Sequence, residues 1–264
     1  MESLKNTIYY FSGTGNSLYL SKKLAERLKD FEVKSIKNAV QNNDYVCNCE
    51  KIGIIFPVYC LGIPEIVERF IENIHIENNP YIFCIANYGG EYGGAYFQLS
   101  ELLNKKGKIL SANFGIKMPD NYVVLLNSPK KHNIEKILDN ADIMIEKVAK
   151  SIDASENNNF GMQLFKKIGY KVIYPFWKRN LSKFDKSFKV SKNCNLCGTC
   201  KLVCPVRNID IKDGHIIWKH GCQDCMACIQ ICNKKAISRW LSKYNRQYFN
   251  PRISTAEYMR GDIK

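Results

Sequence analysis

Long apolar runs are missing from this sequence. No stretch reaches the roughly 18 uninterrupted apolar residues that indicate a membrane-spanning helix, and the most apolar one, 52–64, is interrupted by Gly53 and Pro57. This absence excludes a transmembrane span. The start of the chain also lacks a signal-peptide pattern, because Glu2 precedes an apolar stretch that leads directly into a glycine-rich turn. We therefore expect a cytoplasmic protein.

Acidic residues are scarce in the second half of the chain. Residues 1–155 hold 18 Lys and Arg against 18 Asp and Glu, whereas residues 156–264 hold 21 against 7. The whole net charge of +14 thus follows a polar stretch at 155–159, which we interpret as a domain boundary. A basic half can indicate nucleic-acid binding, but no helix-turn-helix, zinc-finger or RNA-binding pattern accompanies it. We expect no nucleic-acid partner.

Histidine is scarce as well, and no pair of the four has metal-ligand spacing, whereas cysteine is abundant. Of twelve cysteines, eight follow the pattern C-x2-C-x2-C-x3-C, which occurs twice. The two motifs are Cys194, Cys197, Cys200 and Cys204, then Cys222, Cys225, Cys228 and Cys232. The first three cysteines of such a motif can hold three corners of a 4Fe–4S cubane. The fourth lies on the following helix and points away, toward a neighbouring cluster.

The spacing therefore predicts two clusters that exchange their fourth ligands. One set is Cys194, Cys197, Cys200 and Cys232, and the other is Cys222, Cys225, Cys228 and Cys204. Two structural zinc sites are an alternative, but they favour separated C-x2-C pairs. Disulfides are another alternative, but they need an oxidising compartment. We expect iron–sulfur clusters.

The two cysteine motifs have similar surroundings. An isoleucine follows the last cysteine of each motif by five residues, as Ile209 and Ile237, which indicates two pseudo-symmetric halves. This segment resembles the bacterial two-cluster 4Fe–4S ferredoxins, although Asn233 stands where the second motif usually carries proline. The resemblance implies a small α+β ferredoxin-like domain with two 4Fe–4S clusters at residues 191–240.

The first half begins with a strand, a short polar turn and a helix. The strand is the β-prone run 7–11, and the helix carries Leu20, Leu24 and Leu28 on one face. The turn between them reads Ser12, Gly13, Thr14, Gly15, Asn16 and Ser17. Backbone N–H groups and hydroxyls at a helix N-terminus make an anion site, so the turn predicts phosphate binding.

The kind of phosphate can be narrowed by elimination. The turn lacks the Gly-Lys-Ser/Thr of nucleoside triphosphate sites. Leu18 replaces the third glycine of the dinucleotide fingerprint, and no acidic residue near Ile36 is placed to hold a ribose. A hydroxyl-rich turn without Lys or Arg suits a terminal monophosphate. The turn resembles the FMN phosphate loop of flavodoxins residue for residue.

The resemblance to flavodoxins implies an α/β fold for residues 1–155, with a doubly wound, five-stranded parallel sheet. It also implies that two loops, each after a buried strand, contact the isoalloxazine ring of FMN. Their expected contact residues are Pro57, Val58, Tyr59, Cys60, Leu61, Gly62, Asn87, Tyr88, Gly89, Gly90, Tyr92, Gly93 and Gly94. Tyr59 and Tyr88 are the preferred stacking residues, although either can be a packing aromatic instead. Residues 119–122 would close the site.

Together the two halves look like the flavodoxin–ferredoxin fusion proteins of anaerobic bacteria and archaea. The resemblance implies an electron-transfer flavoprotein that passes electrons between two 4Fe–4S clusters and FMN and converts one- and two-electron steps. An alternative is an FMN-dependent reductase of a small organic acceptor, a quinone or another flavin, fed by the clusters. We expect no separate catalytic residue for electron transfer itself.

Two segments carry no motif, the basic aromatic region 156–190 and the C-terminal extension 241–264. In the first, apolar residues recur every four positions, and Pro175 should stop or kink the helix. These apolar residues are Phe160, Leu164, Ile168, Val172 and Phe176. The helix can pack the two domains together as a linker. Alternatively, the basic stretch Lys166 to Lys192 docks an acidic redox protein (ferredoxin-like or a flavoprotein), a reductase or an anionic membrane.

Overall fold

A computed structural model describes the chain over residues 5–124, 128–158, 164–239 and 247–263, with residues 164–169 described by their backbone only. Within these residues, a parallel sheet with strand order β2-β1-β4-β6-β7 forms the centre of the first half. Its strands are β1 (Asn6–Tyr10), β2 (Phe31–Ser35), β4 (Lys51–Pro57), β6 (Tyr81–Tyr88) and β7 (Leu110–Lys117). The expected α/β fold with a five-stranded parallel sheet is confirmed.

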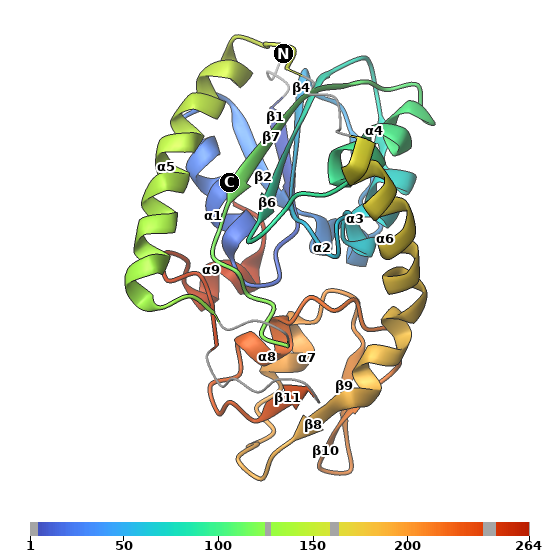
Figure 1. The fold of residues 1–264 in the computed structure, drawn as a ribbon, viewed down its shortest axis with the longest axis vertical. Coiled ribbons are helices and arrows are strands. Elements are labelled where there is room, and N and C mark those ends of the chain that lie inside the picture. Colours follow the sequence, from blue (N-terminus) through green and yellow to red (C-terminus); the bar gives the residue numbers. More distant parts are fainter. Residues whose placement is uncertain (1–4, 125–127, 159–163, 240–246, 264) are drawn as a thin grey trace.

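Helices cover both faces of this sheet, because its central strands are apolar on both sides. Figure 1 shows α1 and α5 on one face and α2, α3 and α4 on the other, and each group has its own buried core. The helices are α1 (Asn16–Ala25), α2 (Ile36–Asn42), α3 (Glu65–Asn73), α4 (Ala95–Asn104) and α5 (Lys131–Asp153). A short parallel pair, β3 (Val46–Cys47) and β5 (His75–Ile76), lies beside them.

The long helix α6 (Leu164–Phe184) runs along the outside of the first half and continues to the second (Figure 1). It passes through Pro175 without ending, so of the two expected effects, a stop or a kink, the stop is wrong. The apolar residues that recur every four positions do not form a buried face where their side chains are described, since Val172 and Phe176 are 66% and 70% exposed. Tyr174 and Leu181 are buried instead. Tyr174 can be buried because its hydroxyl donates a hydrogen bond to the backbone carbonyl of Ile63. Phe160 lies outside the described residues, as do the side chains of Leu164 and Ile168.

The second half consists of short elements around the cysteines. Strands β8 and β11 pair antiparallel, and β9 and β10 form a hairpin. Ile209 and Ile237 are both buried in one cluster that also contains cysteines of both motifs. The elements are η1 (Asp185–Ser187), β8 (Phe188–Val190), α7 (Thr199–Val203), β9 (Ile209–Lys212), β10 (His215–Trp218), α8 (Ala227–Gln230) and β11 (Ile237–Arg239).

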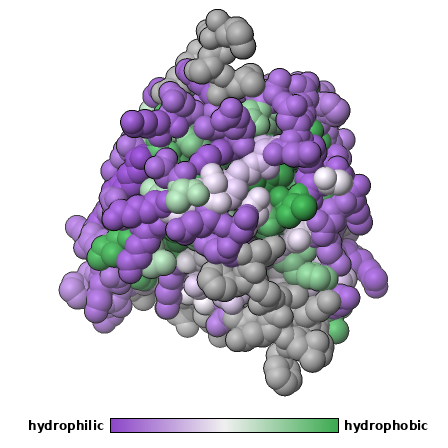
Figure 2. Space-filling model, turned by 90° about the horizontal axis from the view of Figure 1, so that it is seen from above, coloured by the Kyte–Doolittle hydropathy of each residue, from purple (hydrophilic) through white to green (hydrophobic). Residues whose placement is uncertain are grey.

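The end of the chain returns to the first half. Residues 247–263 include α9 (Thr255–Arg260) and reach β2, where Ile263 pairs with Val33. In Figure 1 the C-terminus accordingly lies beside the central sheet, far from the cysteine motifs. The sequence assigned no role to this segment. Among the described residues, no helix combines the length and apolar character that crossing a bilayer requires. The end of the molecule shown in Figure 2 is mainly hydrophilic, with apolar residues in separate small groups.

Candidate functional site

A cavity of about 400 Å³ lies at the carboxyl ends of the parallel strands, where doubly wound sheets bind ligands. Several of its lining residues belong to the predicted flavin loops and the predicted phosphate loop. These are Asn16, Pro57, Val58, Tyr59, Cys60, Asn87, Tyr88, Gly89 and Gly90. The remaining wall residues are Glu91, Met118, Pro119, Asp120, Asn121, Tyr122, Trp177, Asp224, Cys225 and Met226. The cavity is therefore enclosed by both halves of the chain and by α6.

The phosphate loop, residues 12–17, lies between β1 and α1. Gly15 precedes the helix with a φ of +89°, a left-handed conformation that glycine adopts without steric cost, and no side chain caps the helix. In the described part of the chain, no protein group accepts a hydrogen bond from the backbone N–H groups of residues 13–17. Buried N–H groups are normally paired, so these donors fit an anionic ligand.

Two hydroxyls of this loop have their oxygen atoms already engaged. Ser17 Oγ accepts a hydrogen bond from Asn87 Nδ2 at 2.7 Å, and Thr14 Oγ1 accepts one from the Asn121 amide. Both hydroxyl side chains belong to residues that are almost completely buried. A hydroxyl has one proton to donate besides its acceptor sites, so each of these groups can still donate to a ligand.

Some predicted residues do not line the cavity. The wall includes neither Ser12, Gly13, Thr14, Gly15 and Ser17 of the phosphate loop nor Leu61, Gly62, Tyr92, Gly93 and Gly94 of the predicted flavin loops. A Cβ atom on Gly62 would lie 2.3 Å from the Tyr174 ring, and one on Gly94 would lie 2.4 Å from Tyr170. These glycines therefore let α6 approach the flavin loops, which is a packing role.

Gly13 brings the phosphate loop against the second cysteine motif. A Cβ atom at this position would lie 2.4 Å from the carbonyl oxygen of Cys225 and 2.9 Å from the Tyr59 hydroxyl. A larger residue could not be accommodated without moving the backbone of the motif. The absence of a side chain here therefore allows the two predicted cofactor sites to adjoin.

Aromatic side chains form part of the cavity wall. Tyr59 makes edge contacts with Phe11 and Trp177, with ring centroids 6.3 Å apart in both cases. Burial raises the pKa of the Tyr59 phenol, so it stays neutral. In the second flavin loop, Tyr88 makes an edge contact with Tyr92, with ring centroids 5.7 Å apart. Trp177 was missed by the sequence analysis, although the spacing of Tyr170, Tyr174 and Trp177 along one helix face was a signal for it.

A buried ion pair joins the second motif to α6 at this wall. Asp224 is 3% exposed and pairs with Arg239, and it accepts hydrogen bonds from the Tyr122 hydroxyl at 2.9 Å and from Trp177 Nε1 at 3.3 Å. The pKa of Asp224 is raised, because the effect of burial exceeds the lowering by Arg239 and the two hydrogen bonds. Both carboxylate oxygens have partners, so neither is left unsatisfied within the wall.

The cysteines of the second motif gather with the last cysteine of the first. Cys204, Cys222, Cys225 and Cys228 all line one small cavity, together with the ring of Trp218. Burial raises the pKa of Cys222 to about 12 and raises those of Cys225 and Cys228, and the neighbouring thiols add to each shift. Among the described residues, the buried indole N–H of Trp218 has no hydrogen-bond partner. The exchanged set of four cysteines is thus present in one place.

The other four cysteines range from buried Cys200 to exposed Cys197. Burial raises the pKa of Cys200, and the thiols of Cys194 and Cys232 add to the shift. Cys197 is exposed, and the Thr199 hydroxyl lowers its pKa. In the described residues, no three His, Cys, Asp or Glu side chains converge on a point that could hold a single metal ion. The ligands of a cubane bind four different iron atoms, so they need not converge in this way.

A search of curated protein sequences finds no significant match. Solved structures that resemble the chain include a flavoprotein in complex with FMN from Lactobacillus acidophilus, at 16% identity and a TM-score of 0.34, over 43% of this chain and 93% of the other. An azoreductase from Bacillus anthracis has 13% identity and a TM-score of 0.36, over 55% of this chain and 99% of the other. Rubredoxin oxygen:oxidoreductase from Desulfovibrio gigas has 18% identity and a TM-score of 0.35, over 57% and 36%.

The family comparison covers the region that carries the sheet and the phosphate loop. A model of the flavodoxin domain matches residues 7–140, which is 134 of the 264 residues and therefore just over half of the chain. The chain belongs to the flavodoxin domain family.

Proposed function

We propose that the chain is an electron-transfer flavoprotein that binds FMN in the cavity and two 4Fe–4S clusters at the cysteine motifs. The observation that carries the proposal is the position of Cys225, a predicted cluster ligand that is also a wall residue of the flavin cavity. FMN supplies one- and two-electron exchange when bound, and each cluster supplies single-electron exchange. The chain thus holds both kinds of site next to each other.

The residues of the cavity fit FMN. The N–H groups of residues 13–17 and the hydroxyl protons of Thr14 and Ser17 are available for a phosphate dianion. Tyr59, Trp177 and Tyr88 line the space for the ring. The volume lies at the lower end of the range for single-ligand pockets, about 300–1,000 Å³. The alternative, an FMN-dependent reductase of a quinone or flavin, needs access for a second ligand to the flavin ring.

The residues of the second half fit the clusters. Four cysteines line one cavity in the combination that cross-ligation requires, and the free Trp218 N–H can donate to a cysteine sulfur. Backbone N–H groups already donate to the last cysteine of each motif, from Asn208 to Cys204 Sγ at 3.2 Å and from Ala236 to Cys232 Sγ at 3.3 Å. Such hydrogen bonds adjust the reduction potential of a cluster. The proposal implies a reducing compartment, the cytoplasm.

The basic region next to the first motif fits an acidic redox partner, which we propose to be ferredoxin-like. Its exposed bases include Lys186, Lys189 and Lys192, and the exposed Cys197 follows in the chain. Lys178 is excluded from this surface because it pairs with Glu68 at 2.6 Å. The side chains of Lys166 and Lys167 lie outside the described residues. Opposite charge would guide the partner to the edge of the first motif.

Anaerobic purification tests the proposal. We expect about eight iron, about eight sulfide and about one FMN per chain, from absorbance, elemental analysis and chromatography of the released flavin. Stoichiometric zinc in place of iron would overturn the cluster assignment, and a chain that binds no FMN would overturn the flavin assignment. Mixing the reduced protein with excess quinone separates the two functions. With a reductant supplied, a reductase shows a rate that saturates with quinone concentration, whereas a carrier without a quinone site shows a rate that rises in proportion to it.

A further inference from the structure

Three consecutive carbonyl groups of the phosphate loop are held by the far end of the chain. The hydroxyl of Tyr258 lies within hydrogen-bond distance of the carbonyl oxygens of Ser12, at 3.1 Å, and Gly13, at 3.0 Å. The backbone N–H of Asn250 donates to the carbonyl of Thr14 at 2.9 Å. In a trans peptide unit the C=O and the following N–H point in opposite directions. The three contacts therefore turn the next N–H groups of the loop away from the C-terminal segment, toward the anion site.

The same segment orients the first residue of α1, which lines the cavity. Asn16 Oδ1 accepts hydrogen bonds from the Tyr248 hydroxyl at 2.6 Å and from Asn250 Nδ2 at 3.1 Å. Its own amide donates to the carbonyl of Pro119 at 3.2 Å. Asn16 is 4% exposed, so these partners fix a buried amide. The C-terminal segment thus determines the backbone of the loop and one side chain beside it.

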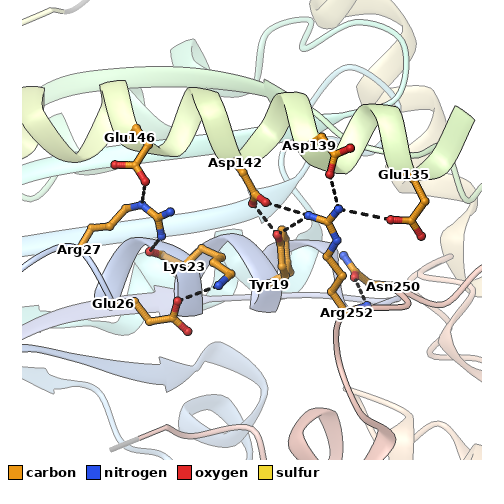
Figure 3. Close-up of polar contacts among 10 residues, drawn as sticks. All are labelled: Tyr19, Lys23, Glu26, Arg27, Glu135, Asp139, Asp142, Glu146, Asn250 and Arg252. Atoms are coloured by element: carbon orange, nitrogen blue, oxygen red, sulfur yellow. Dashed lines mark hydrogen bonds and ion pairs between the residues drawn. The ribbon is translucent and has the colours of Figure 1, made fainter.

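The segment is anchored on one side of the loop by a single arginine, as Figure 3 shows. The guanidinium of Arg252 reaches three carboxylates on α5, Glu135 at 3.3 Å, Asp142 at 2.8 Å and Asp139. It also donates to the hydroxyl of Tyr19 on α1 at 2.9 Å. Isolated surface ion pairs contribute little, but a guanidinium shared by several acceptors is held in one position.

The segment is anchored on the other side by β2 and its neighbours. Ile263 exchanges backbone hydrogen bonds with Val33, at 3.1 and 2.9 Å. The Tyr10 hydroxyl donates to the carbonyl of Gly261 at 2.6 Å, and Lys22 pairs with Glu257 at 2.6 Å. Because contacts of this kind hold the chain before and after Tyr258, the segment lies across the loop in one defined position.

We propose that residues 247–263, the C-terminal strap, form part of the flavin-phosphate site. Tyr258 and Asn250 are positioning residues that keep the N–H groups of the loop directed at the phosphate, and Arg252 holds the strap in place. This inference rests on the proposed function, since it takes FMN as the ligand. Donors that are oriented before binding lose less conformational freedom when the dianion arrives, so affinity for the phosphate is higher.

The sharpest variant is Tyr258→Phe, which keeps the ring and removes the hydroxyl. We expect the affinity for FMN to fall about tenfold while that for riboflavin, which lacks the phosphate, stays unchanged. Both can be measured by the change of flavin fluorescence on binding. The matched control is Tyr81→Phe, whose hydroxyl donates to the carbonyl of Glu156 at 2.7 Å, away from the loop. The ³¹P signal of bound FMN should shift in the first variant and not in the control.

The anchor is tested with Arg252→Gln and Arg252→Lys. We expect Arg252→Gln to lower the FMN-to-riboflavin affinity ratio and to increase hydrogen exchange in the strap, and Arg252→Lys to restore part of both. If wild-type protein binds FMN but neither Tyr258→Phe nor Arg252→Gln changes the ratio, the inference is wrong while the proposed function stands. An equal fall in the affinities for FMN and riboflavin would also overturn the inference, because such a fall would show a merely structural effect. Wild-type protein that binds neither flavin would overturn the proposed function instead.

Discussion

The flavodoxin half and the cysteine-rich segment, residues 188–239, support their chemical groups in different ways. In the flavodoxin half, the loops project from a sheet whose core is complete without a ligand, and Ile8, Leu24 and Phe83 are fully buried. In the cysteine-rich segment, strands of three or four residues surround a core that includes Cys200, Cys204 and Cys228 among its buried members. The first half therefore has an apolar framework of its own, whereas cysteines form part of the buried core of the second.

The largest expected effect follows from this difference. Removing iron with a chelator should unfold residues 188–239, because the thiols buried there lose the groups that compensate their burial. Residues 6–153 should remain folded. Hydrogen exchange followed by mass spectrometry would show the loss of protection in the first range only. Retained protection in the cysteine-rich segment after complete iron removal would show that its apolar core is sufficient alone.

A single cysteine should break one cluster and spare the other. Cys204→Ala is expected to remove about four of about eight iron, although Cys204 belongs to the first motif. Because Cys204 lines the same cavity as Cys222, Cys225 and Cys228, those three should become reactive toward iodoacetamide, as mass spectrometry can show. Labelling of the other three cysteines of the first motif instead would contradict the exchanged ligands. Cys47→Ala, at a buried cysteine of the flavodoxin half, is the control and should keep all iron.

The phosphate loop can be weakened without disturbing its framework. Thr14→Ala with Ser17→Ala removes two hydroxyl donors, each contributing about 1.5–3 kcal/mol to a charged acceptor, so FMN affinity should fall by about 100-fold or more. Riboflavin affinity should change little. The control is Ser21→Ala, because the Ser21 hydroxyl already donates to the carbonyl of Ser17 at 2.8 Å. Titration of both flavins measures the effect, and equal losses would place the phosphate elsewhere.

Local patterns in the sequence were sufficient to predict the sheet. The exchange of ligands between the two cysteine motifs, which also comes from a local pattern, stays a prediction. A strand, a polar turn and a helix follow one another within residues 7–25, and the cysteine spacings are equally local. The strap could not be predicted, because Asn250 and Thr14 lie far apart in the sequence and neither belongs to a periodic pattern. Only the folded chain brings the N–H of Asn250 to the carbonyl of Thr14.

The face of α6 was mispredicted for a different reason. Apolar periodicity selected Val172 and Phe176, but the helix buries Tyr174 and Leu181 and turns Trp177 toward the cavity. Aromatic rings with a polar atom can bury a large area and still satisfy that atom, as the Tyr174 hydroxyl does at 2.8 Å from the carbonyl oxygen of Ile63. A hydropathy pattern that counts tyrosine as polar misses this face.

The contribution of α6 to the flavin site can be measured by a pair of adjacent variants. Trp177→Ala removes part of the cavity wall, and we expect the affinities for FMN and riboflavin to fall together, by about fivefold. Phe176→Ala is the control, because its side chain is 70% exposed and should change neither. An effect on FMN alone would contradict the assignment of Trp177 to the ring region. Variants of the ring site should change the affinities for FMN and riboflavin alike, whereas variants of the phosphate site should change the affinity for FMN only.

The smallest expected effect concerns the charged surface next to the first motif. Lys186, Lys189 and Lys192 are exposed, whereas the flavodoxin half is neutral as a whole, so long-range attraction should act on the cysteine-rich side. Their reversal to glutamate should slow electron exchange with an acidic ferredoxin-like carrier by about two- to threefold at physiological ionic strength, where screening limits the effect. It should also flatten the dependence of that rate on salt, measured by stopped flow.

The matched control reverses three exposed lysines of the flavodoxin half, Lys29, Lys105 and Lys150. If attraction acts through the surface beside the first motif, this control changes the rate less than the other reversal does, although the total charge changes by the same amount. Equal effects of the two reversals would mean that net charge alone controls the encounter. A rate indifferent to salt and to both reversals would exclude an acidic partner, and the basic region would then serve only to pack the two halves together.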